Sequence, residues 1–161
     1  MEEGVRAQTA DPKDKSILIV EEDKNQRIIF SKMIEEQGFQ VDQAADAKET
    51  LQKIGAKKYD LILLEFALQG MGGMEMLHQI RDTPCAESSV VIWTAKNVDE
   101  QMKMHVKSEP GVKEFLTKPV QHTILTNLLH KLLGTRPKPK QNPDDTGGFG
   151  RTTTGFGKRG W

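Results

Sequence analysis

The sequence lacks several features that mark whole classes of protein. It has a single cysteine, Cys85, among 161 residues, which excludes an internal disulfide framework. No apolar run approaches the roughly 20 residues that a membrane-spanning helix needs. The first residues, "MEEGVRAQTADPKDK", contain no apolar core of the kind that a secretory signal has. We therefore expect a cytoplasmic protein.

Motifs for nucleotide binding and an excess of one charge are also missing. The chain has no GxxxxGKS, GxxxxGKT or GxGxxG stretch, so no motif supports a nucleotide site. Lys plus Arg and Asp plus Glu number 23 each, so the overall charge does not predict a nucleic-acid binder. The charge is uneven along the chain, however, because basic residues outnumber acidic ones from Arg136 onward.

Short apolar runs alternate with helical patterns through most of the chain. The runs predict strands at residues 16–20, 39–44, 60–65, 89–94 and 112–116. Between and after them, apolar residues at helical spacing predict helices at about 23–37, 46–56, 73–82, 98–107 and 120–133. This alternation is typical of an α/β domain with a doubly wound, five-stranded parallel sheet. The first, third and fourth runs are nearly continuous in apolar residues, as buried strands are, so we expect the second and fifth nearer the edges.

The composition divides the chain into three parts. We expect a flexible N-terminal arm at residues 1–14, the α/β domain at 15–134 and a disordered, basic, Pro- and Gly-rich tail at 135–161. Gly38 and Gly134 stand where the first and last helices should end. The tail contains three aromatic residues, Phe149, Phe156 and Trp161.

Polar residues stand where the predicted strands end. Ligands of open parallel sheets bind outside the carboxyl ends of the strands, so side chains at those ends should meet in one pocket. They are Glu21, Glu22 and Asp23 after the first strand, Glu65 in the third, Thr94 in the fourth, and Lys118 after the fifth. Each also has a plain structural interpretation, since acidic residues before a helix often serve only to cap it.

Four stretches, "ILIVEED", "YDLILLEFALQGMGG", "VVIWTAK" and "GVKEFLTKP", together resemble the receiver domains of bacterial two-component response regulators. The resemblance covers roughly residues 15–133 and implies the flavodoxin-like (βα)5 fold of that family. It also implies roles for single residues: an acidic, Mg²⁺-binding pair at Glu21 and Glu22, the phosphoacceptor position at Glu65, a phosphate switch at Thr94 and Lys118, and a reporting aromatic at Phe115.

The carboxylates depart from the family pattern. Glu22 and Glu65 stand where the family has Asp, and each adds one carbon–carbon bond, roughly 1.5 Å. A misplacement of about 1 Å can lower a rate on the order of a hundredfold, and Mg²⁺ tolerates little distortion of its oxygen ligands. Gln69 and Gly72 also replace the usual Pro and Asp. We therefore interpret the chain as a degenerate receiver, in which Mg²⁺ binding by Glu22 and Glu65 is weak or lost.

Glu65 admits two interpretations. In the first, its longer side chain carries the carboxylate toward Lys118 and Thr94, where phosphoryl oxygens would lie, and so replaces phosphorylation. In the second, Glu65 is merely paired and no switch remains.

The resemblance also suggests where partners bind. The family's output surface is the fourth helix, fifth strand and fifth helix, which here includes Met102 and Met104 as adaptable contacts. The tail's "GFGR" and "GFGK" sequences suit an aromatic anchor on a protein partner, and less well RNA, because the tail offers few phosphate contacts.

Three functions remain open. We favour a stand-alone receiver-like module that is no enzyme and acts by protein–protein interaction without phosphorylation. The second is a single-domain response regulator phosphorylated by a histidine kinase with Mg²⁺. The third is association with nucleic acid through the tail.

Overall fold

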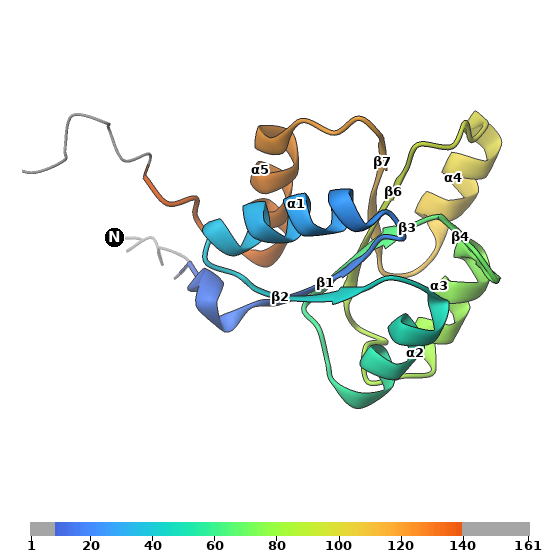
Figure 1. Cartoon of the computed structure of the whole chain (residues 1–161), viewed down its shortest axis with the longest axis horizontal. Coiled ribbons are helices and arrows are strands. Elements are labelled where there is room, and N and C mark those ends of the chain that lie inside the picture. Colours follow the sequence, from blue (N-terminus) through green and yellow to red (C-terminus); the bar gives the residue numbers. More distant parts are fainter. Residues whose placement is uncertain (1–8, 140–161) are drawn as a thin grey trace, which may run out of the picture.

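Five strands form one parallel sheet in the order β2-β1-β3-β6-β7 in the computed structural model, which describes residues 9–139 (Figure 1). Their bounds are Ser16–Val20 for β1, Gln40–Ala44 for β2, Leu61–Glu65 for β3, Ser89–Thr94 for β6 and Val112–Thr117 for β7. The predicted strands match these bounds to within one residue at each end. The second and fifth strands lie at the two edges, as their alternating sequences predicted.

Helices cover both faces of the sheet (Figure 1). Helices α1 (Lys24–Glu36) and α5 (His122–Leu133) lie on one face, and α2 (Ala47–Ala56), α3 (Gly73–Arg81) and α4 (Glu100–Ser108) lie on the other. Successive strand residues point to opposite faces, so Ile17 and Ile19 pack beneath α1 and α5 while Leu18 and Val20 pack beneath α2 and α3. A doubly wound, flavodoxin-like sheet is therefore confirmed.

The helix ends explain where the elements start and stop. The carboxylate of Asp23 accepts a hydrogen bond of 2.8 Å from the backbone N–H of Gln26 and so caps α1. Gly134 ends α5 with a left-handed φ of 65°, which glycine adopts without a steric cost. Capping thus accounts for Asp23, but Glu21 and Glu22 of the same acidic triplet have other partners.

A short antiparallel hairpin follows β3 and was not predicted. It pairs β4 (Ala67–Leu68) with β5 (Met71–Gly72), and Gly70 closes the turn with a φ of 81°. The next residue, Gly73, is buried directly against Phe66: a Cβ at this position would lie 2.2 Å from Phe66 Cδ2. Because there is no room for a side chain, glycine lets the hairpin fold back onto the end of β3.

The described ends of the chain lie side by side. The backbone N–H of Ala10 donates to the carbonyl of Gly134 at 3.0 Å, and Ala10 forms a bridge with Thr135. A 3-10 helix, η1 (Pro12–Asp14), then leads into β1. The predicted arm and tail lie partly outside the described residues, and their boundaries stay predictions. Among residues 9–139, no helix is long and apolar enough to cross a bilayer.

A buried histidine joins α5 to the end of α1. His130 is 2% exposed; its Nε2 lies 2.9 Å from Gln37 Oε1 and its Nδ1 lies 2.7 Å from Thr135 Oγ1. A neutral ring satisfies both contacts, donating through Nε2 and accepting at Nδ1. Burial lowers the pKa of His130 from its usual value of 6.5, because it disfavours the charged ring.

Acid should weaken this joint. The folded-state pKa of His130 lies below the unfolded value of 6.5. The stability that the neutral ring contributes is therefore fully present above pH 6.5 and is lost as the pH falls from there through the folded-state pKa. Urea unfolding between about pH 7 and pH 5 should show a free energy of unfolding that drops less steeply in His130→Gln than in the wild type. The remaining histidines are common to both proteins, so equal slopes would contradict the assignment.

The contact between Gly73 and Phe66 should be sensitive to a single methyl group. Gly73→Ala forces the Phe66 ring or the hairpin to move and should lower the free energy of unfolding by about 1–3 kcal/mol, as overpacking does. Gly55→Ala is the matched control, because nothing lies within 4 Å of its Cβ position and alanine favours the helix. Urea unfolding should therefore show opposite or at least very different effects; equal effects would contradict the close contact.

Candidate functional site

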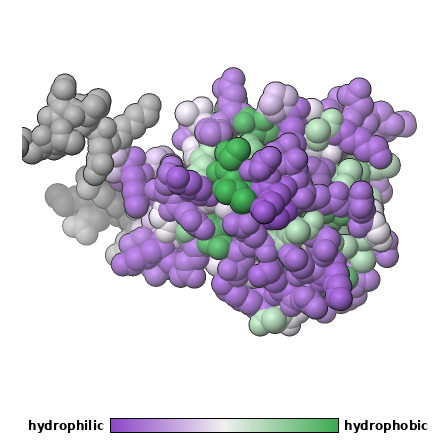
Figure 2. All heavy atoms as spheres, in the orientation of Figure 1, coloured by the Kyte–Doolittle hydropathy of each residue, from purple (hydrophilic) through white to green (hydrophobic). Residues whose placement is uncertain are grey.

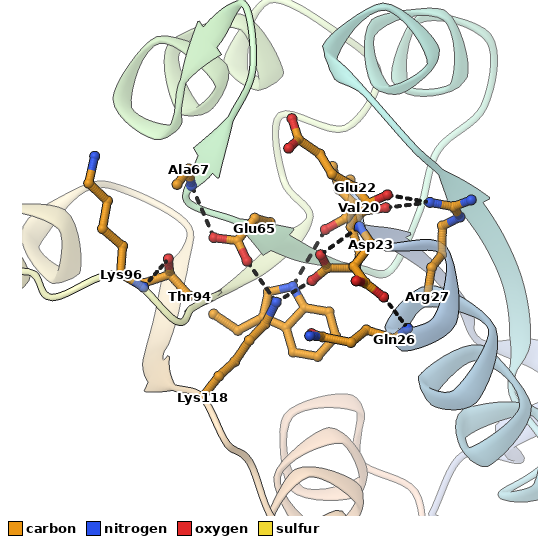
Figure 3. Close-up of polar contacts among 12 residues, drawn as sticks. Val20, Glu22, Asp23, Gln26, Arg27, Glu65, Ala67, Thr94, Lys96 and Lys118 are labelled. Carbon is orange, nitrogen blue, oxygen red and sulfur yellow. Dashed lines mark hydrogen bonds and ion pairs between the residues drawn. The ribbon is translucent and has the colours of Figure 1, made fainter.

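The carboxyl ends of the central strands surround a small open cavity of about 280 Å³. It is lined by residues from the β1–α1 loop, β3, the end of β6 and the β7–α5 loop (Figure 3). The sequence-predicted residues that line it are Glu21, Glu22, Asp23, Glu65, Thr94 and Lys118. The fold brings these six together although they are spread over almost 100 positions, from 21 to 118.

Lys118 lies at the centre of the cavity. Its Nζ donates to Glu65 Oε2 at 2.7 Å and also to a carboxylate oxygen of Glu21. The Lys118 and Glu65 side chains are each 9% exposed and that of Glu21 is 5% exposed. Nζ also lies 4.4 Å from the ring centroid of the buried Trp93, a favourable position for a cation. The ammonium group is therefore surrounded by two carboxylates and an indole face.

Both oxygens of Glu65 have partners. Oε2 accepts from Lys118, and Oε1 accepts from the backbone N–H of Ala67 at 3.0 Å. This explains how a carboxylate ends a buried strand, because a buried charge is stable only when paired and hydrogen-bonded.

The first interpretation of Glu65 directed its carboxylate toward both Lys118 and Thr94, but Glu65 and Thr94 are not hydrogen-bonded to each other. Thr94 Oγ1 instead accepts from the backbone N–H of Lys96 at 3.2 Å, and Glu65 turns toward Lys118 (Figure 3). The hydroxyl is used within its own loop, and the ammonium is the stronger partner for a carboxylate.

Glu22 points away from Lys118 (Figure 3). Its carboxylate accepts from the backbone N–H of Gln69, in the turn of the β4–β5 hairpin. The loop that carries Glu22 is held by Arg27, whose Nη1 donates to the carbonyls of Glu21 at 2.7 Å and Glu22 at 3.2 Å. A proline at position 69 would have no N–H to donate, so the residue types at 22 and 69 depend on each other.

The carboxylates as arranged do not fit Mg²⁺. This ion needs several oxygen ligands in near-octahedral geometry. Lys118 lies between Glu21 and Glu65, and Glu22 is turned toward the hairpin. Within residues 9–139, no three potential ligands among His, Cys, Asp and Glu come together in a way that could hold a metal ion. No chemical step through a bound metal follows from this arrangement.

The remaining predicted residues lie apart from the cavity. Phe115 is half-buried on β7, with its ring centroid 6.1 Å from that of Phe66 and 5.9 Å from Lys103 Nζ. The predicted tail anchors, Phe149, Phe156 and Trp161, lie outside the described residues. Sequence reasoning missed Trp93 and Arg27 as neighbours of the site, because an apolar strand residue and a helix arginine carry no signal of such a role.

Comparison with known proteins identifies relatives of this chain and of its fold. A family model described as "Response regulator receiver domain" matches residues 17–130. The response regulator ArlR of Staphylococcus saprophyticus is 31% identical over 133 residues, which cover 83% of this chain and 58% of ArlR. The chain thus matches little more than half of that relative's length.

Solved structures of response regulators and their receiver domains have the same fold. A two-component response regulator from Clostridium difficile superposes with a TM-score of 0.68 at 29% identity, covering 74% of this chain and 95% of the other. The receiver domain of the sensor histidine kinase PA1611 from Pseudomonas aeruginosa, with a magnesium ion coordinated in its active site cleft, has a TM-score of 0.65 at 21% identity. It covers 75% of this chain and 98% of its own length.

Removing the ammonium group of Lys118 should destabilise the folded protein. Lys118→Met leaves two buried carboxylates without their common partner, which should lower the free energy of unfolding by about 3–5 kcal/mol. Adding Glu65→Gln should recover part of this loss, because one of the two unpaired charges is removed. Urea unfolding measures all three proteins, and Lys113→Met, at an exposed position on β7, the strand before Lys118, is the control. A Lys118→Met protein as stable as this control would contradict the charge cluster.

Proposed function

Because the chain belongs to the response regulator receiver domain family, we propose that it is a receiver-like signalling module that acts through protein–protein contacts without phosphorylation of Glu65. The observation that carries this proposal is that all four carboxylates that line the cavity are already partnered within the protein. Asp23 caps α1 by accepting from the backbone N–H of Gln26. Glu21 and Glu65 share Lys118, and Glu22 accepts from Gln69.

Phosphoryl transfer would have to break these contacts. It requires a nucleophile aligned with the leaving group and cations that neutralise the charge of the moving group. Here each oxygen of Glu65 accepts a hydrogen bond, and Lys118 already compensates two carboxylates. The extra methylene of Glu65 brings a permanent negative charge to the ammonium group. We propose that this pair holds the domain in one signalling state in place of a phosphoryl group.

Exposed apolar side chains support a function in protein binding. On α4, Met102 is 40% and Met104 is 71% exposed, on the surface that the family resemblance assigns to output. Figure 2 shows a second hydrophobic strip on the face that carries α1 and the start of α5, within a mostly hydrophilic surface. Ile28, Ile29 and Ile124 are each about half exposed there. We propose that another signalling protein, such as a histidine kinase, binds one of these surfaces, and that Phe149 and Phe156 of the tail add a contact.

A second candidate is a response regulator that still accepts a phosphoryl group. Thr94 and Lys118 both line the cavity, which is open beside Glu65. In this alternative, Mg²⁺ would draw Glu22 away from Gln69 and Glu65 away from Lys118. The two candidates therefore differ in what Mg²⁺ does to the protein.

An amide NMR titration tests the choice. Mg²⁺, added alone and then with a phosphoryl mimic, should leave the signals of Glu22, Thr94 and Lys118 in the wild type without saturable shifts. The reason is that the internal partners compete with the metal. Glu22→Asp combined with Glu65→Asp shortens both side chains so that they no longer reach Gln69 and Lys118 in the same way, and it should restore saturable Mg²⁺ shifts at these positions.

Saturable shifts in the wild type that extend to Phe115 would instead establish the phosphorylatable regulator. Glu75→Asp, which shortens an exposed carboxylate on α3, is the matched control and should behave as the wild type does.

A further inference from the structure

An apolar groove lies beside the charged cavity. It runs between the β4–β5 hairpin with the start of α3 and the β6–α4 loop with the start of α4, elements that are neighbours in Figure 1. Its volume is about 580 Å³, within the range of about 300–1,000 Å³ that is usual for ligand pockets. The apolar side chains that line it are Phe66, Leu68, Met74, Val98 and Met102.

The groove is distinct from the cavity around Lys118. The two share only Ala67 and Lys96 among their lining residues. One wall is the hairpin, whose turn is held by the bond from Gln69 to Glu22, and whose base is fixed by the close packing of Phe66 on Gly73. Because backbone contacts set this wall, the groove is largely formed before anything binds to it.

We propose that this groove binds an aromatic side chain from the C-terminal segment of the same chain, residues 140–161, with Trp161 as the anchor. The lining is mainly apolar with a polar rim of Gln69, Lys96, Asn97 and Asp99, which suits an indole with its apolar body and single N–H donor. Apart from Pro143, the segment has no aliphatic apolar residue with a side chain, so Phe149, Phe156 and Trp161 are its only large apolar groups.

The length of the segment excludes the first of these aromatics, Phe149. The described chain ends where Lys138 packs beside Gly38, just before β2 begins, and Figure 1 shows this end of the molecule opposite to α4 and β4. A domain of this size is about 35 Å across, and a path over its surface is longer. An extended chain covers about 3.3 Å per residue, so Phe149 reaches only about 33 Å beyond residue 139. Trp161 reaches about 70 Å by the same rule. Phe156 reaches about 56 Å at 3.3 Å per residue, so the choice of Trp161 over Phe156 rests on the larger indole ring and its N–H donor.

The charge on the groove rim is mixed, so it does not decide whether the tail binds there. Asp99 and Glu100 at the start of α4 can face Lys158 and Arg159 of the tail, while Lys96 on the same rim has the tail's own sign. The apolar contact of Trp161 therefore carries the binding. A single anchor is sufficient because its attachment to the same chain gives it an effective concentration that is roughly millimolar for short linkers.

Methyl NMR of the full chain tests the proposal, with the methionine methyl groups as probes. Met74 and Met102 line the groove, while Met104 on the same helix as Met102 does not. Trp161→Ala should shift the Met74 and Met102 methyl signals, because they lose the indole ring current, and should leave Met104 unchanged. Phe149→Ala is the matched control in the same tail and should shift none of them. All shifts should be independent of protein concentration.

Substitutions in the wall of the groove test the same proposal. In Met102→Glu, a charge replaces an apolar wall, so Trp161→Ala should no longer shift Met74; in Met104→Glu the shift should persist. If the Met74 and Met102 signals are the same with and without Trp161, the occupant is Phe156 or a separate partner, and the proposal is wrong. Shifts that grow with protein concentration would identify a second copy's tail and equally overturn it.

The inference goes beyond the function proposed above and can fail separately. The groove methyl groups report on Trp161, whereas the Mg²⁺ titration reports on Glu22 and Lys118. If Trp161 does not occupy the groove, the proposal that Glu65 is not phosphorylated is unaffected. If the wild type binds Mg²⁺, the proposal that Trp161 occupies the groove is unaffected.

Discussion

One ammonium group connects the functional end of this sheet. Lys118 follows β7, Glu21 follows β1 and Glu65 ends β3, so the Lys118 contacts tie three strands together at their carboxyl ends. All three side chains are almost fully buried, and a buried charge without a partner is costly. The carboxylates therefore depend on Lys118 for their stability, and the cavity takes the shape that this pairing requires. The ring of Trp93 also lies close to the ammonium group, with its centroid 4.4 Å from Nζ.

A second contact joins this cavity to the neighbouring hairpin. Glu21 and Glu65 contact Lys118 and Asp23 caps α1, while Glu22 turns outward and accepts from Gln69. That bond holds the β4–β5 hairpin, and the hairpin in turn forms one wall of the apolar groove. Changes that look unrelated along the chain, a longer acid at 22 and a residue with a free N–H at 69, thus act together. The charged cavity and the apolar groove are two sides of the same hairpin.

The protein keeps the receiver fold while its polar groups satisfy one another. A receiver domain that signals by phosphorylation needs side chains whose best partners arrive from outside, as a metal ion or a phosphoryl group. In this chain the partners are internal, which favours a stable charge cluster over a switch. The apolar side chains exposed on α1, α4 and α5 are then the groups left to carry a signal, since they have no partner within the described domain. This reasoning links the chemistry of the cavity to our proposal of function by binding.

The local sequence was enough to predict the sheet. Continuous apolar runs, helical spacing and capping residues are local patterns, and they placed all five strands, their edges and the helix ends at Gly38 and Gly134. Parallel topology also brings residues 21, 22, 65, 94 and 118 to one edge, because strand ends meet there. Which of these residues pair was beyond the sequence. One of the two interpretations of Glu65 directed its carboxylate toward both Thr94 and Lys118, but Thr94 bonds to its own loop. The orientation of Glu22, the β4–β5 hairpin and the position of Trp93 were not predicted. They depend on differences of an ångström or two in the distances between residues that are far apart in the sequence. Only tertiary packing sets those distances, and hydrogen bonds and ion pairs form or fail within them.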